Sequence, residues 1–244
     1  MSLSKEATLF SELVLEPPEV NAVLQELPFA LTYAANLKEK DHAVLFYDNL
    51  AAAAEYICAY VEAGINRRQA TFFVGLDRVH YEALFDQVGI KSKELENAGY
   101  LKHVTTEEFC IENGVFSNDK MLQNIEEFLS IEKESGSKSA RFVIMGSNIQ
   151  ELLTSSQLIE FEEAVGKFSQ YPLSILCCHD SRRSIMHETA PSLFHQLLKS
   201  HDHCLFQGIA MPTKGMLVQA ESQDRGKQWF SQRLNELIGS VLLE

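Results

Sequence analysis

The sequence predicts an α/β protein with three layers, in which a mostly parallel sheet lies between two layers of helices. Short apolar runs without polar alternation recur along the chain, and such runs are typical of strands that are buried on both faces. Amphipathic helical segments separate these runs. This alternation favours parallel strands joined by right-handed crossovers.

The elements of this α/β pattern follow one another with few interruptions. The predicted strands are short and apolar, and the last two are predicted edge strands: 43–47, 70–75, 100–104, 140–145, 173–178, 203–206 and 216–219. The predicted helices carry apolar residues at helical spacing: 49–63, 77–88, 120–131, 155–168 and 191–199. Gly64 stands where the C-cap of the first of these helices is expected.

Two segments flank the predicted α/β sensory domain, which spans residues 41–220. Residues 1–40 are predicted to be an N-terminal helical extension, because apolar residues recur at helical spacing between residues 19 and 37. Residues 221–244 are predicted to form a C-terminal amphipathic helix with Trp229 and Leu237 on its apolar face. That face suits packing on its own domain or a homodimer interface.

The charge and the terminal sequence restrict the class of partner. The chain has 21 basic and 34 acidic residues, and its formal net charge is −13. This charge opposes direct binding to nucleic acid or to an anionic membrane, because both need clustered positive charge. We find no secretory signal, no apolar run that could span a bilayer and no disulfide-like pattern among the 5 cysteines. We therefore expect a cytoplasmic protein that works through a protein partner.

The residues that come after the predicted strands form a polar rim. In open α/β sheets, ligands bind beyond the carboxyl ends of the strands, and a small-molecule site needs a few polar groups on an apolar frame. Asp48 is also placed to cap the helix that follows it, and this role is compatible with ligand binding. The candidate ligand-binding residues are Tyr47, Asp48, Gly146, Ser147, His179 and Asp180.

Two positions lack the groups that a nucleotide-hydrolysing frame would carry. The first strand-to-helix junction holds Tyr47, Asp48 and Asn49 in place of a glycine-rich phosphate loop, and an acidic side chain there repels phosphate. After strand 140–145, Gly146 and Ser147 stand where an ATPase would carry a magnesium-binding carboxylate. We therefore expect a frame of the P-loop NTPase type without a P-loop, and neither catalytic residues nor a cofactor.

Two polar groups need a separate interpretation. Arg141 begins a buried strand, where a guanidinium needs a partner, and we expect a structural ion pair with Glu162 of the next helix. His201 and His203 have the most metal-like spacing in the chain, since they would share one face of a strand. A zinc site needs further ligands, which the sequence does not indicate, so we expect no metal site.

The order of these segments resembles that of the MEDS domain, the methanogen/methylotroph sensory domain named after a dichloromethane-responsive regulator. The resemblance covers about residues 41–206, although Cys178 and His179 depart from the family, where an aromatic residue before the aspartate is more usual. It implies a RecA-like and KaiC-like frame without the phosphate loop, and a sensor of small organic molecules. The matching runs are H-A-V-L-F-Y at 42–47, A-G-I-N-R-R-Q-A-T-F-F-V at 63–74, R-F-V-I-M-G at 141–146, L-I-E-F-E-E-A-V at 158–165 and L-C-C-H-D at 176–180.

The sequence and the resemblance together predict a non-enzymatic sensor. It would bind a small organic ligand at the carboxyl ends of the strands and signal through a protein partner such as a kinase or a transcription regulator. Two alternatives stay open. The frame could bind a nucleotide without hydrolysing it, or the chain could be an interaction protein whose strand ends are filled by Phe46, Phe73 and Met145.

Overall fold

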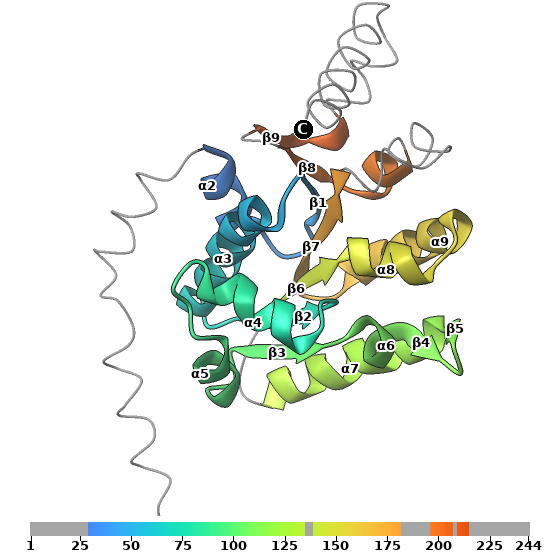
Figure 1. Cartoon of the computed structure of the whole chain (residues 1–244), viewed down its shortest axis with the longest axis horizontal. Coiled ribbons are helices and arrows are strands. Elements are labelled where there is room, and N and C mark those ends of the chain that lie inside the picture. Colours follow the sequence, from blue (N-terminus) through green and yellow to red (C-terminus); the bar gives the residue numbers. More distant parts are fainter. Residues whose placement is uncertain (1–28, 135–138, 182–195, 207–208, 215–244) are drawn as a thin grey trace, which may run out of the picture.

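Seven strands form one sheet in the order β3-β2-β6-β7-β1-β8-β9. The structure is a computed structural model that describes residues 29–134, 139–181, 196–206 and 209–214. Neighbouring strands pair in parallel except for β8 and β9, which are antiparallel. Helices cover both faces of the sheet (Figure 1), which confirms the predicted three-layer α/β architecture. The RecA-like identity of this frame stays a prediction.

Six strands of the sheet lie close to their predicted positions, and the seventh, at residues 209–212, was not predicted. The strands are β1 (His42–Tyr47), β2 (Ala70–Val74), β3 (Leu101–Val104), β6 (Ala140–Met145), β7 (Leu173–Asp180), β8 (His203–Phe206) and β9 (Ile209–Pro212). β7 is longer than predicted, so His179 and Asp180 are strand residues. The predicted strand 216–219 lies outside the described residues. A separate hairpin of β4 (Ile111–Glu112) and β5 (Val115–Phe116) was not predicted, because such short strands carry little pattern.

Two helices are longer than predicted, two are shorter, and three short ones were missed. The helices are α2 (Phe29–Ala35), α3 (Leu50–Asn66), α4 (Arg78–Asp86), α5 (Ser92–Asn97), α6 (Thr106–Cys110), α7 (Asn118–Glu134), α8 (Gly146–Leu152) and α9 (Ser155–Gly166), followed by the 3₁₀ helix η1 (Lys167–Gln170). Within the described ranges, no helix is long and apolar enough to cross a bilayer. The predicted C-terminal helix and residues 1–28 lie outside these ranges.

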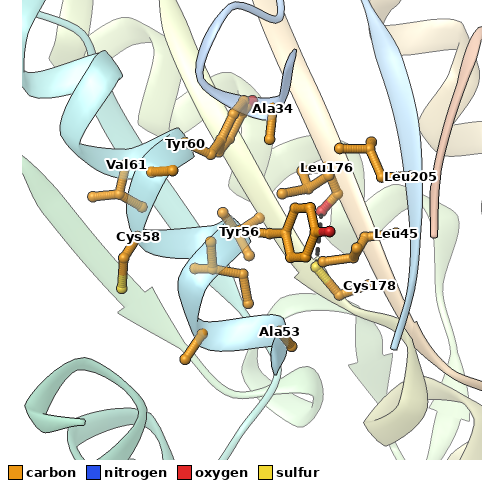
Figure 2. Packing of buried hydrophobic residues seen from close by; sticks show 14 of the residues in the cluster. Ala34, Leu45, Ala53, Tyr56, Cys58, Tyr60, Val61, Leu176, Cys178 and Leu205 are labelled. Carbon is orange, nitrogen blue, oxygen red and sulfur yellow. Dashed lines mark hydrogen bonds between the residues drawn. The ribbon is translucent and has the colours of Figure 1, made fainter. Parts of the chain in front are cut away.

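The two faces of the sheet are covered by different helices. α2, α3 and α4 pack on one face, which we call the α3 face, and α7, α8 and α9 pack on the other, the α9 face (Figure 1). Figure 2 shows Tyr56 of α3 lying over Leu45 and Leu176 of the α3 face. Because every second residue of a strand points to the same side, Cys177 and Cys178 face opposite layers.

Arg141 is fully buried under α3, and its position explains the glycine at residue 64, which was expected to end the helix. The helix continues through Gly64 to Asn66, and Arg67 is its C-cap. A Cβ atom added at Gly64 would lie 2.7 Å from Cδ of Arg141, so only glycine leaves room for the guanidinium. The guanidinium lies 4.3 Å from the centroid of the Tyr60 ring.

The predicted ion pair between Arg141 and Glu162 is wrong. Arg141 points to the α3 face, where it donates to the carbonyl of Tyr60 at 2.7 Å, to Oε1 of Gln69 at 2.9 Å and to two further carbonyls. Glu162 lies on α9, and its side chain contacts residues of the α9 face. The sheet separates the two charges, and backbone carbonyls replace the carboxylate as partners of Arg141. The sequence order placed both residues near one strand but did not show which face each would reach.

Candidate functional site

The next described helical residues after β1 and after β7 lie on opposite faces of the sheet. β1 runs into α3 on the α3 face, whereas the helical residues 196–200 that come after β7 pack on the α9 face through Leu197 and Leu198. Open α/β sheets bind ligands where neighbouring strands diverge in this way at their carboxyl ends. The end of the β1–β7 pair is therefore a candidate binding position.

Two other strand pairs diverge, but direct contacts fill their ends. At the end of β2 and β6, a Cβ atom added at Gly75 would lie 2.5 Å from Cβ of Met145, so these residues are in close contact. At the end of β2 and β3, Nε2 of His103 donates to the carbonyl of Leu76 at 2.9 Å, and the His103 ring stacks on Tyr81. These contacts make the β1–β7 end the stronger candidate.

Polar residues of the predicted site meet at the β1–β7 end. Tyr47 and Asp180 are register partners on the two strands, so their side chains leave the sheet on the same face. Ser181 is buried, and its Oγ donates to the carbonyl of Tyr47 at 2.9 Å, which ties the two strand ends together. Asp48 is next in the chain and accepts a hydrogen bond from Nδ2 of Asn49 at 2.8 Å.

The expected capping role of Asp48 is wrong. Asn49 is the N-cap of α3, since its Oδ1 accepts from the backbone N–H of Ala52 at 2.8 Å. Asp48 is partly exposed, and its carboxylate is not used to cap the helix. The carboxylate is therefore better placed for a ligand than the sequence suggested.

Gly146 and His179 form a second group on the α9 face. Gly146 is buried and begins α8, and a Cβ atom added there would lie 2.7 Å from Nδ1 of His179. The absence of a side chain at this position lets the imidazole lie against the backbone. Ser147 belongs to the first turn of α8, but its side chain lies outside the described part of the chain. The predicted site residues thus divide between two faces, and β7 connects them.

Glu162 is the centre of a buried polar group that we call the Glu162 cluster. Its Oε1 accepts from Nε2 of His179 at 3.0 Å, and its Oε2 lies 3.4 Å from Nε2 of His201 and 4.0 Å from Nε2 of His42. Nε2 of His42 also lies 3.4 Å from Sγ of Cys177. All five residues are almost completely buried. They come from β1, β7, α9 and the residue that precedes β8 by two positions.

Two imidazoles of the cluster are oriented by the backbone. Nδ1 of His42 donates to the carbonyl of Ser200 at 3.0 Å, and Nδ1 of His201 donates to the carbonyl of Leu197 at 2.6 Å. Three buried atoms of the cluster have no hydrogen-bond partner among the described residues: Oε2 of Glu162, Nε2 of His201 and Nδ1 of His179. Buried polar atoms are rarely left in this state, so the cluster calls for a functional explanation.

Burial and mutual contacts shift the pKa values of the cluster. Burial alone would raise the pKa of Glu162, but the hydrogen bond from His179 and the charges of the histidines lower it to about 2. Burial, followed by the neighbouring His201, lowers the pKa of His42 well below its usual range, and burial also lowers that of His201. Burial and the charge of Glu162 raise the pKa of the Cys177 thiol. The cluster therefore favours the ionised carboxylate of Glu162, while burial opposes a charge on His42 and His201.

Sequence reasoning missed the Glu162 cluster. His201 and His203 were expected to share a strand face, but β8 begins only at His203, whose Nδ1 lies 2.8 Å from the hydroxyl of Tyr33. The available signal was the alternation within strands, because His42, Cys177 and His179 all point to the α9 face. Using that signal required knowing that β1 and β7 are neighbours.

A comparison with known protein families gives a match over most of the chain. A family model described as MEDS, the methanogen/methylotroph, DcmR sensory domain, matches residues 41–202. This match begins just before β1 and ends just before β8, so it contains the β1–β7 end and the whole Glu162 cluster. No curated protein matches the chain. The match covers well over half of the sequence, and the chain therefore belongs to the MEDS family of sensory domains.

Proposed function

We propose that this chain is a non-enzymatic sensory module that binds a small organic ligand at the carboxyl ends of β1 and β7. Membership of a sensory domain family supports a role in sensing. The observation that carries the position is the meeting of Tyr47, Asp48 and Asp180 at a diverging strand pair. The other diverging ends are filled by contacts between the protein's own residues.

The charge at this strand end favours a neutral or cationic ligand. Asp48 and Asp180 are both partly exposed acidic side chains, and Tyr47 adds a phenol on the same rim. Carboxylates accept hydrogen bonds from hydroxyl and amine groups, whereas they repel phosphates and carboxylates. The proposed ligand class is therefore a small alcohol, another uncharged organic molecule or a cationic amine, in preference to a nucleotide.

The signal would leave the site through the elements that begin there. Asn49 caps α3 directly beside Asp48, so a ligand on Asp48 would contact the start of a helix that covers one face of the sheet. The Ser181–Tyr47 hydrogen bond joins this position to β7. A small shift of α3 on ligand binding would change the surface that a protein partner, such as a kinase or a regulator, contacts.

Binding of small organic molecules to the full chain tests this proposal. We expect a panel of uncharged and cationic compounds to include ligands that raise the melting temperature, and calorimetry to give their affinities. Asp48→Asn and Asp180→Asn should each weaken binding by about tenfold or more, the effect of losing one charge-assisted hydrogen bond. The matched control is Asp77→Asn, because Asp77 comes after β2 in the same way but lies at the filled β2–β6 end.

Two outcomes would contradict the proposal. Equal affinity in the wild type, Asp48→Asn and Asp180→Asn would place the ligand elsewhere. Stabilisation by magnesium and ATP together with turnover would show an enzyme instead of a sensor.

A further inference from the structure

The Glu162 cluster contains an electrostatic problem that its own residues do not solve. His42 and His201 each use Nδ1–H to donate to a backbone carbonyl, so in the neutral imidazole Nε2 carries a lone pair and no proton. Nε2 of His201 nevertheless faces Oε2 of Glu162 at 3.4 Å, and a carboxylate oxygen is also an acceptor. Two buried acceptors that face each other need either a proton or a metal cation between them, and a metal ion would satisfy both at once.

The geometry of the donors fits a divalent metal ion. One ligand atom each from His42, Glu162, Cys177 and His201 lies within 4.8 Å of the others. Bonds of about 2.0–2.3 Å to a tetrahedral zinc ion place its ligands about 3.3–3.8 Å apart. The contacts of 3.4 Å between His42 and Cys177, 3.4 Å between His201 and Glu162, and 4.0 Å between His42 and Glu162 lie close to this range.

The surrounding contacts are those that metal-binding histidines usually have. Ligating imidazoles donate their second N–H to a carbonyl or a carboxylate, which fixes the ring and the tautomer. Ser200 and Leu197 supply such carbonyls to His42 and His201. His179 donates to Oε1 of Glu162, which leaves Oε2 for the ion. The supporting contacts of a metal site are therefore already formed.

The charge balance also favours a divalent ion in this buried position. A glutamate carboxylate and a cysteine thiolate together carry two negative charges, which a divalent cation cancels, so that the site is neutral. Nitrogen and sulfur donors select a transition metal such as zinc over calcium or magnesium, which take six or more oxygen ligands. Four protein donors leave no open position for a substrate, which is typical of a structural site.

We propose that His42, Glu162, Cys177 and His201 bind one divalent transition metal ion of the zinc type. This inference goes beyond the proposed sensing of an organic molecule, and the two can fail independently. The ion would connect α9 and the start of β8 to the two central strands β1 and β7. On binding, the thiol of Cys177 would lose its proton to solvent, since the thiolate is the form that coordinates metal.

Cobalt titration of the full chain, after removal of metal with a chelator, tests the site. We expect one Co²⁺ per chain, a visible spectrum typical of tetrahedral cobalt and a thiolate-to-cobalt charge-transfer band, all displaced by Zn²⁺. Cys177→Ser should abolish the charge-transfer band. Cys178→Ser should keep it, because the Cys178 side chain points to the α3 face. No organic ligand is present, so the result does not depend on the sensing proposal.

A charge-transfer band that persists in Cys177→Ser would overturn the proposal. If Cys177→Ser does not fold, cobalt binding by the wild type still tests the proposal. Bound cobalt without a charge-transfer band, or no saturable binding of Co²⁺ or Zn²⁺, would show that the cluster is not a metal site.

Discussion

Among the described residues, each face of the sheet buries one arginine or glutamate side chain, and the two differ in how their polar atoms are paired. On the α3 face, Arg141 donates from three nitrogens to carbonyls and to Gln69, and it lies over the Tyr60 ring. On the α9 face, Glu162 accepts one hydrogen bond from His179, and its Oε2 has no hydrogen-bond partner among the described residues. Burial is equally complete at both positions.

The difference between the two faces separates a structural charge from a functional one. A buried charge whose nitrogens each have a hydrogen-bond partner holds its surroundings together and has little capacity left for a further partner. A buried charge with an unused oxygen beside unused imidazole nitrogens keeps that capacity. The number of completed hydrogen bonds, more than burial alone, therefore identifies the Glu162 cluster as a candidate site.

Replacing Arg141 should have the largest effect on stability. We expect Arg141→Met to lower the free energy of unfolding by about 3–5 kcal/mol, because the carbonyls that now accept from the guanidinium would be left buried without donors. Urea unfolding measures the change. Arg78→Met is the control, since Arg78 is largely exposed and its surface pairs contribute only about 0–1 kcal/mol. Equal losses of unfolding free energy in both variants would show that the buried hydrogen bonds of Arg141 do not contribute more to stability than surface ion pairs do.

Gly64→Ala should be destabilising, although alanine normally stabilises a helix interior. The added Cβ would lie 2.7 Å from Cδ of Arg141, and overpacking of this kind lowers stability by about 1–3 kcal/mol. Gly166→Ala in α9 is the matched control, because its nearest neighbour would be Nδ1 of His42 at an ordinary 3.5 Å. Thermal unfolding should show a lower melting temperature for Gly64→Ala than for Gly166→Ala. A stabilised Gly64→Ala protein would mean that Arg141 can move aside easily.

Glu162→Gln should have the smallest effect in metal-free protein. The glutamine could accept from His179 through Oε1 and donate through its amide to Nε2 of His201, so we expect a change within about 1 kcal/mol. Urea unfolding after chelator treatment measures it, with the exposed Glu163→Gln as control. A loss as large as that of Arg141→Met would remove the contrast between the two faces.

Most of the fold could be predicted from the sequence because the central strands are continuous apolar runs. β6 matches its predicted bounds, and β1 differs from its prediction by a single residue. The short helices α5, α6 and α8 were missed, since fewer than two full turns give too little periodicity. Gly64 was misread as a helix end. The glycine is needed because Arg141 approaches closely, and a contact between residues so distant in sequence could not be predicted.

The candidate site was predictable only in part. The polar residues at the strand ends could be found from the positions directly after each apolar run, and Tyr47 and Asp180 do lie side by side. The Glu162 cluster draws its members from residues 42 to 201, and its assembly depends on strand order. Glu162 lies on the buried face of α9, but the sequence did not show whether Arg141 or the histidines would contact it.

The alternation of side chains along β7 has a consequence for how the chain finds its native pairing. β7 is buried on both faces, so apolar content alone distinguishes poorly between the native alignment and one shifted by a single residue. A shift would place Cys178 where Cys177 now lies, which is a mild change. It would also place His179 in the apolar layer beneath α3 and remove the hydrogen bond that Oε1 of Glu162 accepts. The polar cluster therefore makes the shifted alignment of β7 less stable than the native one.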